Sequence, residues 1–130
     1  MAADCDLQSI TAIQTALRER VETTAAGDWV QGFKFDDTKT TENRFLFKED
    51  LDAVSTFHPI MVAHRAGHIY YLNTPALEMA GFTKDTPDPF GGRIGRNPDT
   101  GELNGVIYER AIEPVRFGLI PSDSPEIRRE

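Results

Sequence analysis

Two short apolar runs, "IMVAH" at residues 60–64 and "HIYYLN" at residues 68–73, constrain the fold more than any other part of the sequence. The linker "RAG" contains Gly67, whose backbone freedom suits a tight turn, so the two runs predict a β-hairpin. The first run is apolar at successive positions, which indicates a strand that is buried on both faces. The sheet that contains this hairpin therefore needs covering elements on both sides.

Helical patterns flank this hairpin. Ser9 can cap a first helix, and a second, shorter helix fits the apolar spacing within residues 47–54. A third is predicted by "NTPALEMAGF", with Asn73 or Thr74 as its cap and Gly81 at its end. The apolar residues of the first helix recur at steps of three and four: Ile10, Ile13, Leu17 and Val21.

The remaining third of the chain predicts a second hairpin and a last helix. "RIGRNPDTGELNGVIYE" reads as two strands around a turn, and the helix runs from Arg110 through Val115 to Phe117. Helices and hairpins interleave without a regular βαβ rhythm, so we predict an α+β domain with a small mixed or antiparallel sheet and flanking helices. This domain spans residues 1–120, and residues 121–130 are expected to form a poorly ordered polar tail.

The net charge of the chain limits the classes of partner that it can bind. The formal net charge is −7 and the pI is about 4.9, which argues against binding to nucleic acid or to an anionic membrane surface. No apolar run approaches the roughly 20 residues that span a bilayer. The start "MAADCDLQS" does not resemble a secretory signal, so a cytoplasmic location is the default expectation. The single cysteine, Cys5, excludes an internal disulfide and a multi-cysteine zinc site.

His64 and His68 raise the question of a metal site. They can face each other across the hairpin, but two imidazoles without an obvious third ligand make an incomplete zinc site. For His64 we expect a hydrogen bond to a backbone carbonyl instead. Glu109 follows the apolar strand "GVIY" and so lies at a carboxyl end, where α/β enzymes often carry catalytic groups. The alternative for Glu109 is a solvated glutamate at the start of a helix, favoured there by the helix dipole.

Several ordered motifs together resemble one family. They lie in "WVQGFKFDDTK" (29–39), in "LDAVS" (51–55) and in residues 58–111. The pattern is G-H followed by an aromatic strand, then N-x-x-A-L and A-G, T-P-D-P-x-G-G, G-E-x-x-G and a closing E-x-A. This resembles the amidohydrolase superfamily, in particular the amidohydrolase family 3 branch with its N-substituted formamide deformylase-like proteins. Leu103 and Asn104 depart from it, since Pro-Thr is more usual there.

The resemblance implies a metal-dependent hydrolase built on a (β/α)8 barrel with an H-x-H pair on its first strand. A barrel needs about 250 residues, and this chain has 130 and contains no H-x-H. By resemblance, the chain is the α+β segment inserted after the first barrel strand. Zinc or another divalent metal is then expected in the full-length parent, with no metal ligands in this chain.

The resemblance also implies roles for four residues. Glu109 and His68 become catalytic candidates, and Arg65 and Asn73 become candidates for binding substrate near the pocket mouth. The parent would cleave an amide or another C–N bond of a small molecule, with this chain as a pocket wall or lid that is inactive alone. The alternative is a non-catalytic binding or dimerisation module that retains the fold. Faces that pack on the remainder of the parent would be exposed here, so self-association through apolar surface is expected.

Overall fold

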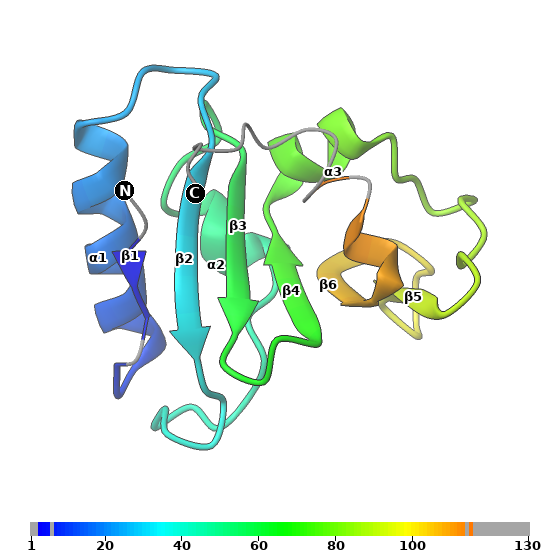
Figure 1. Cartoon of the computed structure of the whole chain (residues 1–130), viewed down its shortest axis with the longest axis horizontal. Helices are drawn as coiled ribbons and strands as arrows, with labels where there is room; N and C mark the ends of the chain where they lie inside the picture. Colours follow the sequence, from blue (N-terminus) through cyan, green and yellow to red (C-terminus); the bar gives the residue numbers. More distant parts are fainter. Residues whose placement is uncertain (1–2, 6, 114, 116–130) are drawn as a thin grey trace, which may run out of the picture.

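A computed structural model describes residues 3–5, 7–113 and 115 of the chain (Figure 1). The predicted tail at 121–130 and the predicted helix end at Phe117 lie outside these residues. The elements, in chain order, are β1 (Ala3–Asp4), α1 (Ile10–Glu22), β2 (Val30–Phe35), α2 (Lys48–Asp52), β3 (Ile60–His64), β4 (Ile69–Leu72), α3 (Thr74–Ala80), β5 (Gly92–Arg96), β6 (Leu103–Glu109) and the 3-10 helix η1 (Arg110–Ile112).

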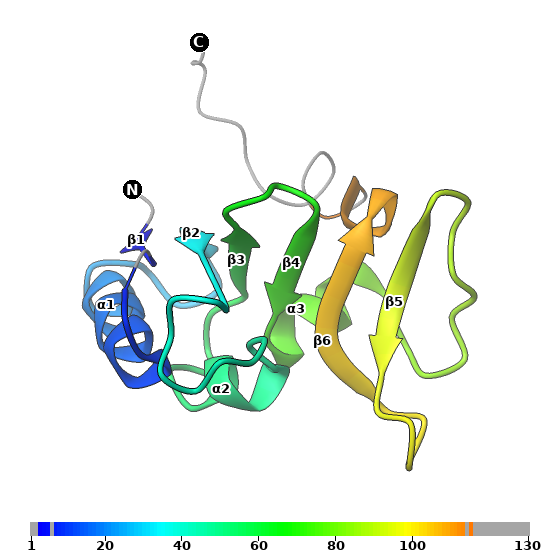
Figure 2. The ribbon, with the colours of Figure 1, turned by 90° about the horizontal axis from the view of Figure 1, so that it is seen from below.

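The strands form a single mixed sheet in the order β1-β2-β3-β4-β6-β5. The pairs β1–β2 and β2–β3 are parallel, and the other pairs are antiparallel. This confirms the predicted α+β class and the small mixed sheet. The sheet is strongly twisted. The strands β2, β3 and β4 lie in the plane of the view in Figure 1, whereas β5 and β6 lie in the plane of the view in Figure 2.

The expected absence of a βαβ rhythm is wrong for the first half of the chain. There α1 connects parallel β1 and β2, and α2 connects parallel β2 and β3. The pattern was hard to see because β1 spans two residues and α2 five. A parallel pair needs a crossover on one face of the sheet, so these two helices determine which strand ends meet at one edge.

The local predictions for hairpins and caps are confirmed. The β3–β4 hairpin pairs Ala63 with Tyr70. The Ser9 side chain accepts a hydrogen bond from the Ala12 amide at 3.0 Å, and Gly81 ends α3 in the left-handed conformation with φ 75°. These features depend on residues close in sequence, which is why periodicity and turn chemistry predict them.

Each face of the sheet carries its own apolar core, as the first hairpin strand predicted. In β3, Ile60 and Val62 join the core beneath α1 and α2, whereas Met61 and Ala63 join the core beneath α3 and η1. Two-sided burial fixes the register of β3, since a shift by one residue would exchange the two sets of side chains.

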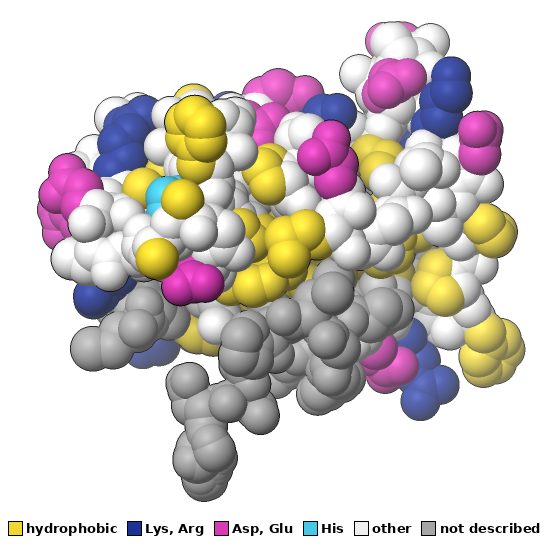
Figure 3. Space-filling model, turned by 90° about the horizontal axis from the view of Figure 1, so that it is seen from above, with side chains coloured by type: hydrophobic (Ala, Val, Ile, Leu, Met, Phe, Trp, Pro, Cys, Tyr) yellow, Lys and Arg dark blue, Asp and Glu magenta, His cyan; other side chains and the backbone are white. Residues whose placement is uncertain are grey.

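Exposed large hydrophobic side chains come from four separate segments: Phe33 of β2, Phe57 after α2, Met79 of α3 and Phe90 before β5. Figure 3, which views the face away from the carboxyl ends of β2 and β3, shows a group of hydrophobic side chains near its centre, with further hydrophobic and charged side chains around it. Self-association through such surface stays a prediction. Among the described residues, no helix is long and apolar enough to cross a membrane.

Candidate functional site at one sheet edge

The predicted site residues of the G-H turn and of β6 gather along one edge of the sheet. The parallel strands β2 and β3 both end there, as their arrowheads show in Figure 1. The antiparallel strand β4 begins there, and β6 ends there, because Ile69 pairs with Tyr108. This topology aligns Asp36 and Asp37 after β2, His64 and Arg65 at the end of β3, His68 before β4, and Glu109 at the end of β6.

His68 and Glu109, the two catalytic candidates, are in contact. Nδ1 of His68 lies 3.4 Å from Oε2 of Glu109, and the two side chains are 68% and 55% exposed. The Glu109 amide also donates to the His68 carbonyl oxygen at 2.7 Å. The structure therefore presents an exposed imidazole–carboxylate pair at the sheet edge.

Glu109 has a strained backbone, with φ 56° and ψ −130°. An L residue with a positive φ costs roughly 1–3 kcal/mol, and such strain is concentrated at functional sites. The Glu109 side chain makes no capping hydrogen bond to η1. Glu109 directly precedes η1 and its side chain is exposed, so its position also fits the alternative of a solvated glutamate at the start of a helix.

Arg65, predicted to bind substrate, lies in the turn between β3 and β4. Its Nη1 is 3.4 Å from Oδ2 of Asp36, and more than half of its side chain is exposed. Asp36 also accepts hydrogen bonds from the Thr38 hydroxyl at 2.6 Å and the Thr38 amide at 2.9 Å. These hydrogen bonds, with a smaller contribution from Arg65, lower the pKa of the Asp36 carboxyl from its usual value. Asp36 thus stays charged and tethers a guanidinium that still faces solvent.

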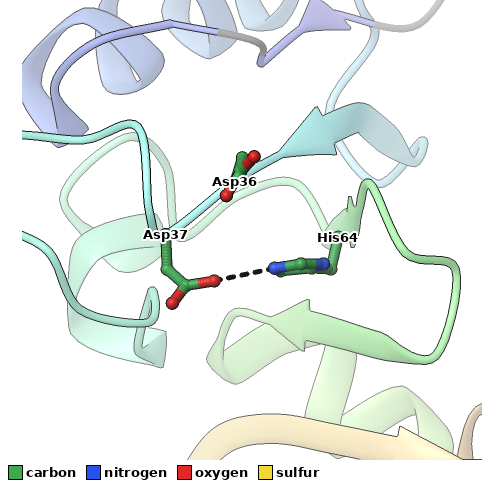
Figure 4. Close-up of side chains that lie close together, drawn as sticks. All are labelled: Asp36, Asp37 and His64. Atoms are coloured by element: carbon green, nitrogen blue, oxygen red, sulfur yellow. Dashed lines mark hydrogen bonds and ion pairs between the residues drawn. The ribbon is translucent and has the colours of Figure 1, made fainter.

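Asp36, Asp37 and His64 form a group of three possible metal ligands whose atoms lie within 4.8 Å of one another. In Figure 4 the His64 ring, at the end of β3, faces the Asp37 carboxylate in the loop that follows β2. His64 Nε2 is 2.8 Å from Asp37 Oδ1. The ring is mostly buried and meets Phe35 and Phe45 edge-on, with ring centroids 6.0 and 6.4 Å away.

The hydrogen bonds of this group do not fit a bound metal. The Ala66 amide donates to His64 Nδ1 at 3.1 Å, so this nitrogen carries a lone pair and the proton lies on Nε2, directed at Asp37. A metal at Nε2 would move that proton to Nδ1, where it would face the Ala66 N–H. The Asp36 oxygens are also engaged, by Thr38 and Arg65. The geometry is that of a histidine–carboxylate pair, and a metal bound to these three residues has no part in the chemistry proposed below.

Asn73 lies away from this edge, at the other end of β4. It is fully buried and caps α3. Its Oδ1 accepts from the amides of Ile60 and Ala76, and its Nδ2 donates to the carbonyls of Ser55 and His58. These four bonds use the whole capacity of the amide. Its assignment to substrate binding stays a prediction, while the observed contacts are structural.

The sequence reasoning missed the partner of His64. We expected a backbone carbonyl, but the ring binds a carboxylate and a backbone amide; it is His58 that bonds a carbonyl, that of Thr24, at 2.9 Å. The available signal was a pair of aspartates directly after one apolar strand and a histidine ending the next. That signal has meaning only if the two strands are parallel neighbours.

Comparison with known proteins identifies relatives of the whole segment. The sequence profile of the amidohydrolase family matches residues 2–130. A Bacillus subtilis (strain 168) protein named as an amidohydrolase, YtcJ, is 30% identical over 119 residues, covering 89% of this chain and 22% of that protein. An N-substituted formamide deformylase from Arthrobacter pascens is 26% identical over 113 residues, covering 85% of this chain and 21% of the relative.

A solved structure shares the fold. The crystal structure of an uncharacterized metal-dependent hydrolase from Pyrococcus furiosus superimposes with a TM-score of 0.65 and 20% sequence identity, over 93% of this chain and 22% of that chain. The chain therefore spans about a fifth of the length of each of these relatives.

Proposed function

This chain belongs to the amidohydrolase family, and from that premise we propose that it is the α+β segment inserted after the first barrel strand of a metal-dependent hydrolase. The parent would cleave an amide or another C–N bond of a small molecule. The segment would form a wall or lid of the substrate pocket, with the sheet edge of Arg65, His68 and Glu109 directed at the substrate.

One observation carries the proposal. Arg65 and His68 of the β3–β4 turn and Glu109 at the end of β6, all assigned to the site from sequence motifs, lie along a single edge, with His68 and Glu109 in contact. Glu109 keeps a strained conformation there. A fold that needed only stability would be expected to use glycine at such a position.

In the proposed mechanism, the remainder of the parent binds the metal, and this chain contacts the substrate. A divalent metal, for which zinc is the expected ion, would lower the pKa of a bound water so that hydroxide is available near neutral pH. Its ligands would come from the remainder of the parent, because the Asp36–Asp37–His64 group is engaged in its own hydrogen bonds. The residues of this chain would bind the substrate and handle protons beside it.

At the edge, Glu109 would accept a hydrogen bond from Nδ1–H of His68. This leaves the His68 Nε2 lone pair free, so that it could accept a proton from the attacking water and return that proton to the leaving nitrogen as the C–N bond breaks. Arg65 remains charged at any relevant pH and offers planar donors to a substrate carbonyl or carboxylate. The 3.4 Å separation of His68 and Glu109 is longer than an ideal hydrogen bond, and we expect it to shorten when substrate covers the pair.

The test uses the full-length hydrolase that contains this segment, with an amide substrate and a metal analysis of each variant. Glu109→Gln keeps the shape of the side chain and removes its charge, and we expect kcat/KM to fall by about 10²–10⁴ with metal content unchanged. His68→Gln should behave similarly. Glu78→Gln, on the exposed side of α3, is the matched control and should retain full activity. Equal activity of Glu109→Gln and the control would contradict the proposal.

A further inference from the structure

We propose that Asp37 and His64 form an acid-sensitive clamp that fixes the turn at residues 64–68 and positions His68 against Glu109. We call this pair the Asp37–His64 clamp. Its residues are positioning residues, because both ring nitrogens of His64 are engaged and Asp37 acts through its contact with that ring. The inference rests on the proposed function for its effect on activity, and on the structure alone for its effect on the turn.

The first step is that both ring nitrogens of His64 join separate segments. Nε2 binds Asp37, in the loop after β2, at 2.8 Å, and Nδ1 accepts the Ala66 amide, inside the turn, at 3.1 Å. The edges of Phe35 and Phe45 hold the plane of the ring. The imidazole thus connects the loop, the strand end and the turn through two hydrogen bonds of fixed direction.

The second step concerns the other hydrogen bonds of the turn, which include one from the Tyr70 hydroxyl to the Gly67 carbonyl at 3.2 Å and one from Arg65 to Asp36 at 3.4 Å. The Gly67 amide donates to the His64 carbonyl at 2.9 Å, and the Arg65 amide donates to the Phe35 carbonyl at 2.8 Å. The turn then delivers His68, whose carbonyl and ring both contact Glu109. A change in the turn is therefore transmitted directly to the position of the His68 imidazole.

The third step concerns protonation. A second proton on His64 must go to Nδ1, where it opposes the Ala66 N–H, so the hydrogen bond between the Ala66 amide and the ring is lost. The charged groups beside the ring are Asp36, Asp37 and Arg65. Tyr71 of β4, which packs on the same two phenylalanine rings, contributes a neutral phenol. Protonation of the ring should therefore break its hydrogen bond with the Ala66 amide and loosen the turn at that residue.

The first experiment observes the clamp by NMR on this chain. With ¹⁵N-labelled protein, the His64 ring nitrogens should show the Nε2–H tautomer at about pH 8. The Ala66 amide should then shift with the His64 ring as the pH is lowered to about 5. A Nδ1–H tautomer, or an Ala66 amide that does not follow the ring, would overturn the clamp whatever the activity of the parent.

The second experiment measures kinetics in the full-length hydrolase. Asp37→Ala removes the acceptor and should lower kcat/KM by about tenfold to a hundredfold, as small misplacements of reacting groups do. Asp37→Asn keeps an oxygen that can accept from Nε2–H and should restore most of the activity. Full activity of Asp37→Ala, in an enzyme that Glu109→Gln inactivates, would overturn the positioning role and leave the proposed function standing. If Glu109→Gln is fully active, the proposed function is wrong. The NMR measurements of the His64 tautomer and the Ala66 amide shift then show whether the Asp37–His64 clamp exists.

Discussion

The amide of Glu109 donates to the carbonyl oxygen of His68 at 2.7 Å, and the carboxylate of Glu109 lies 3.4 Å from the ring of His68. The two residues are thus joined through both backbone and side chain, although they are far apart in sequence. Sheet pairing between β4 and β6 creates this relationship, and the strained backbone of Glu109 lies at its end.

The strain at Glu109 predicts that glycine will be more stabilising than alanine at this position, which is the reverse of the order inside a helix. Glu109→Ala and Glu109→Gly both remove the carboxylate, but only glycine adopts φ 56° without a Cβ clash. We expect Glu109→Gly to exceed Glu109→Ala by about 1 kcal/mol in free energy of unfolding. The same two substitutions at Glu78, inside α3, should differ by about 1 kcal/mol in the opposite sense. Urea unfolding measures both, and the same sign at the two sites would contradict the strain.

Gly92, which pairs with Glu109 in the sheet, is predicted to be intolerant of any side chain. A Cβ there would lie 2.4 Å from the Ala111 amide nitrogen and 2.9 Å from the Tyr108 carbonyl oxygen. Because both neighbours are backbone atoms, we expect Gly92→Ala to cost about 2–3 kcal/mol. Gly101→Ala is the control, since a Cβ at Gly101 meets nothing within 4 Å and only its φ of 76° is strained. A smaller loss of stability for Gly92→Ala than for Gly101→Ala would be inconsistent with this contact geometry.

Asn73 is predicted to contribute more to stability than the other helix cap, Ser9. Asn73→Ala removes the α3 cap and leaves buried groups of Ile60, Ser55 and His58 without that partner. We expect a loss of about 3 kcal/mol or more in free energy of unfolding. Ser9→Ala, which removes one cap bond from α1, should cost about 1 kcal/mol. Chemical denaturation of both variants checks the difference, and equal losses would refute the structural role of Asn73.

Tyr71 is predicted to lower the stability of the fold at alkaline pH. Its hydroxyl is buried without a hydrogen-bond partner, and burial, with a smaller contribution from Asp37, raises the pKa of the phenol. The unfolded chain ionises this phenol near its ordinary pKa of about 10 while the folded chain does not, so stability should fall as the pH rises above about 10.

Tyr71→Phe should remove that alkaline loss and should raise stability by up to about 1 kcal/mol at neutral pH, because an unsatisfied buried hydroxyl is deleted. Tyr108→Phe, at a partly exposed position, should retain the alkaline loss. Unfolding curves at neutral and alkaline pH measure these effects. An unchanged pH dependence in Tyr71→Phe would show that another group causes the loss.

Local chemistry determined much of the fold from sequence. Ser9, Asn73 and Gly81 set helix ends through bonds and dihedral angles within a few residues, and the hairpins followed from apolar strands around Gly67 and Gly101. The family motifs also placed Arg65, His68, Asn73 and Glu109 together near a pocket mouth; in the structure His68 and Glu109 are in contact, whereas Asn73 lies at the other end of β4. Each of these inferences depends on neighbours in sequence or on a pattern that repeats in relatives.

Only the tertiary structure decided which strand ends meet. The parallel pairing of β2 with β3 joins Asp37 to His64 across 27 residues, and the enclosure of Asn73 follows from segments on both sides of β3. Such pairings depend on the total apolar area buried by α1 and α2 over the sheet, and no local pattern encodes that sum. For the same reason the sequence could place Glu109 at the end of a strand but could not reveal its strained backbone.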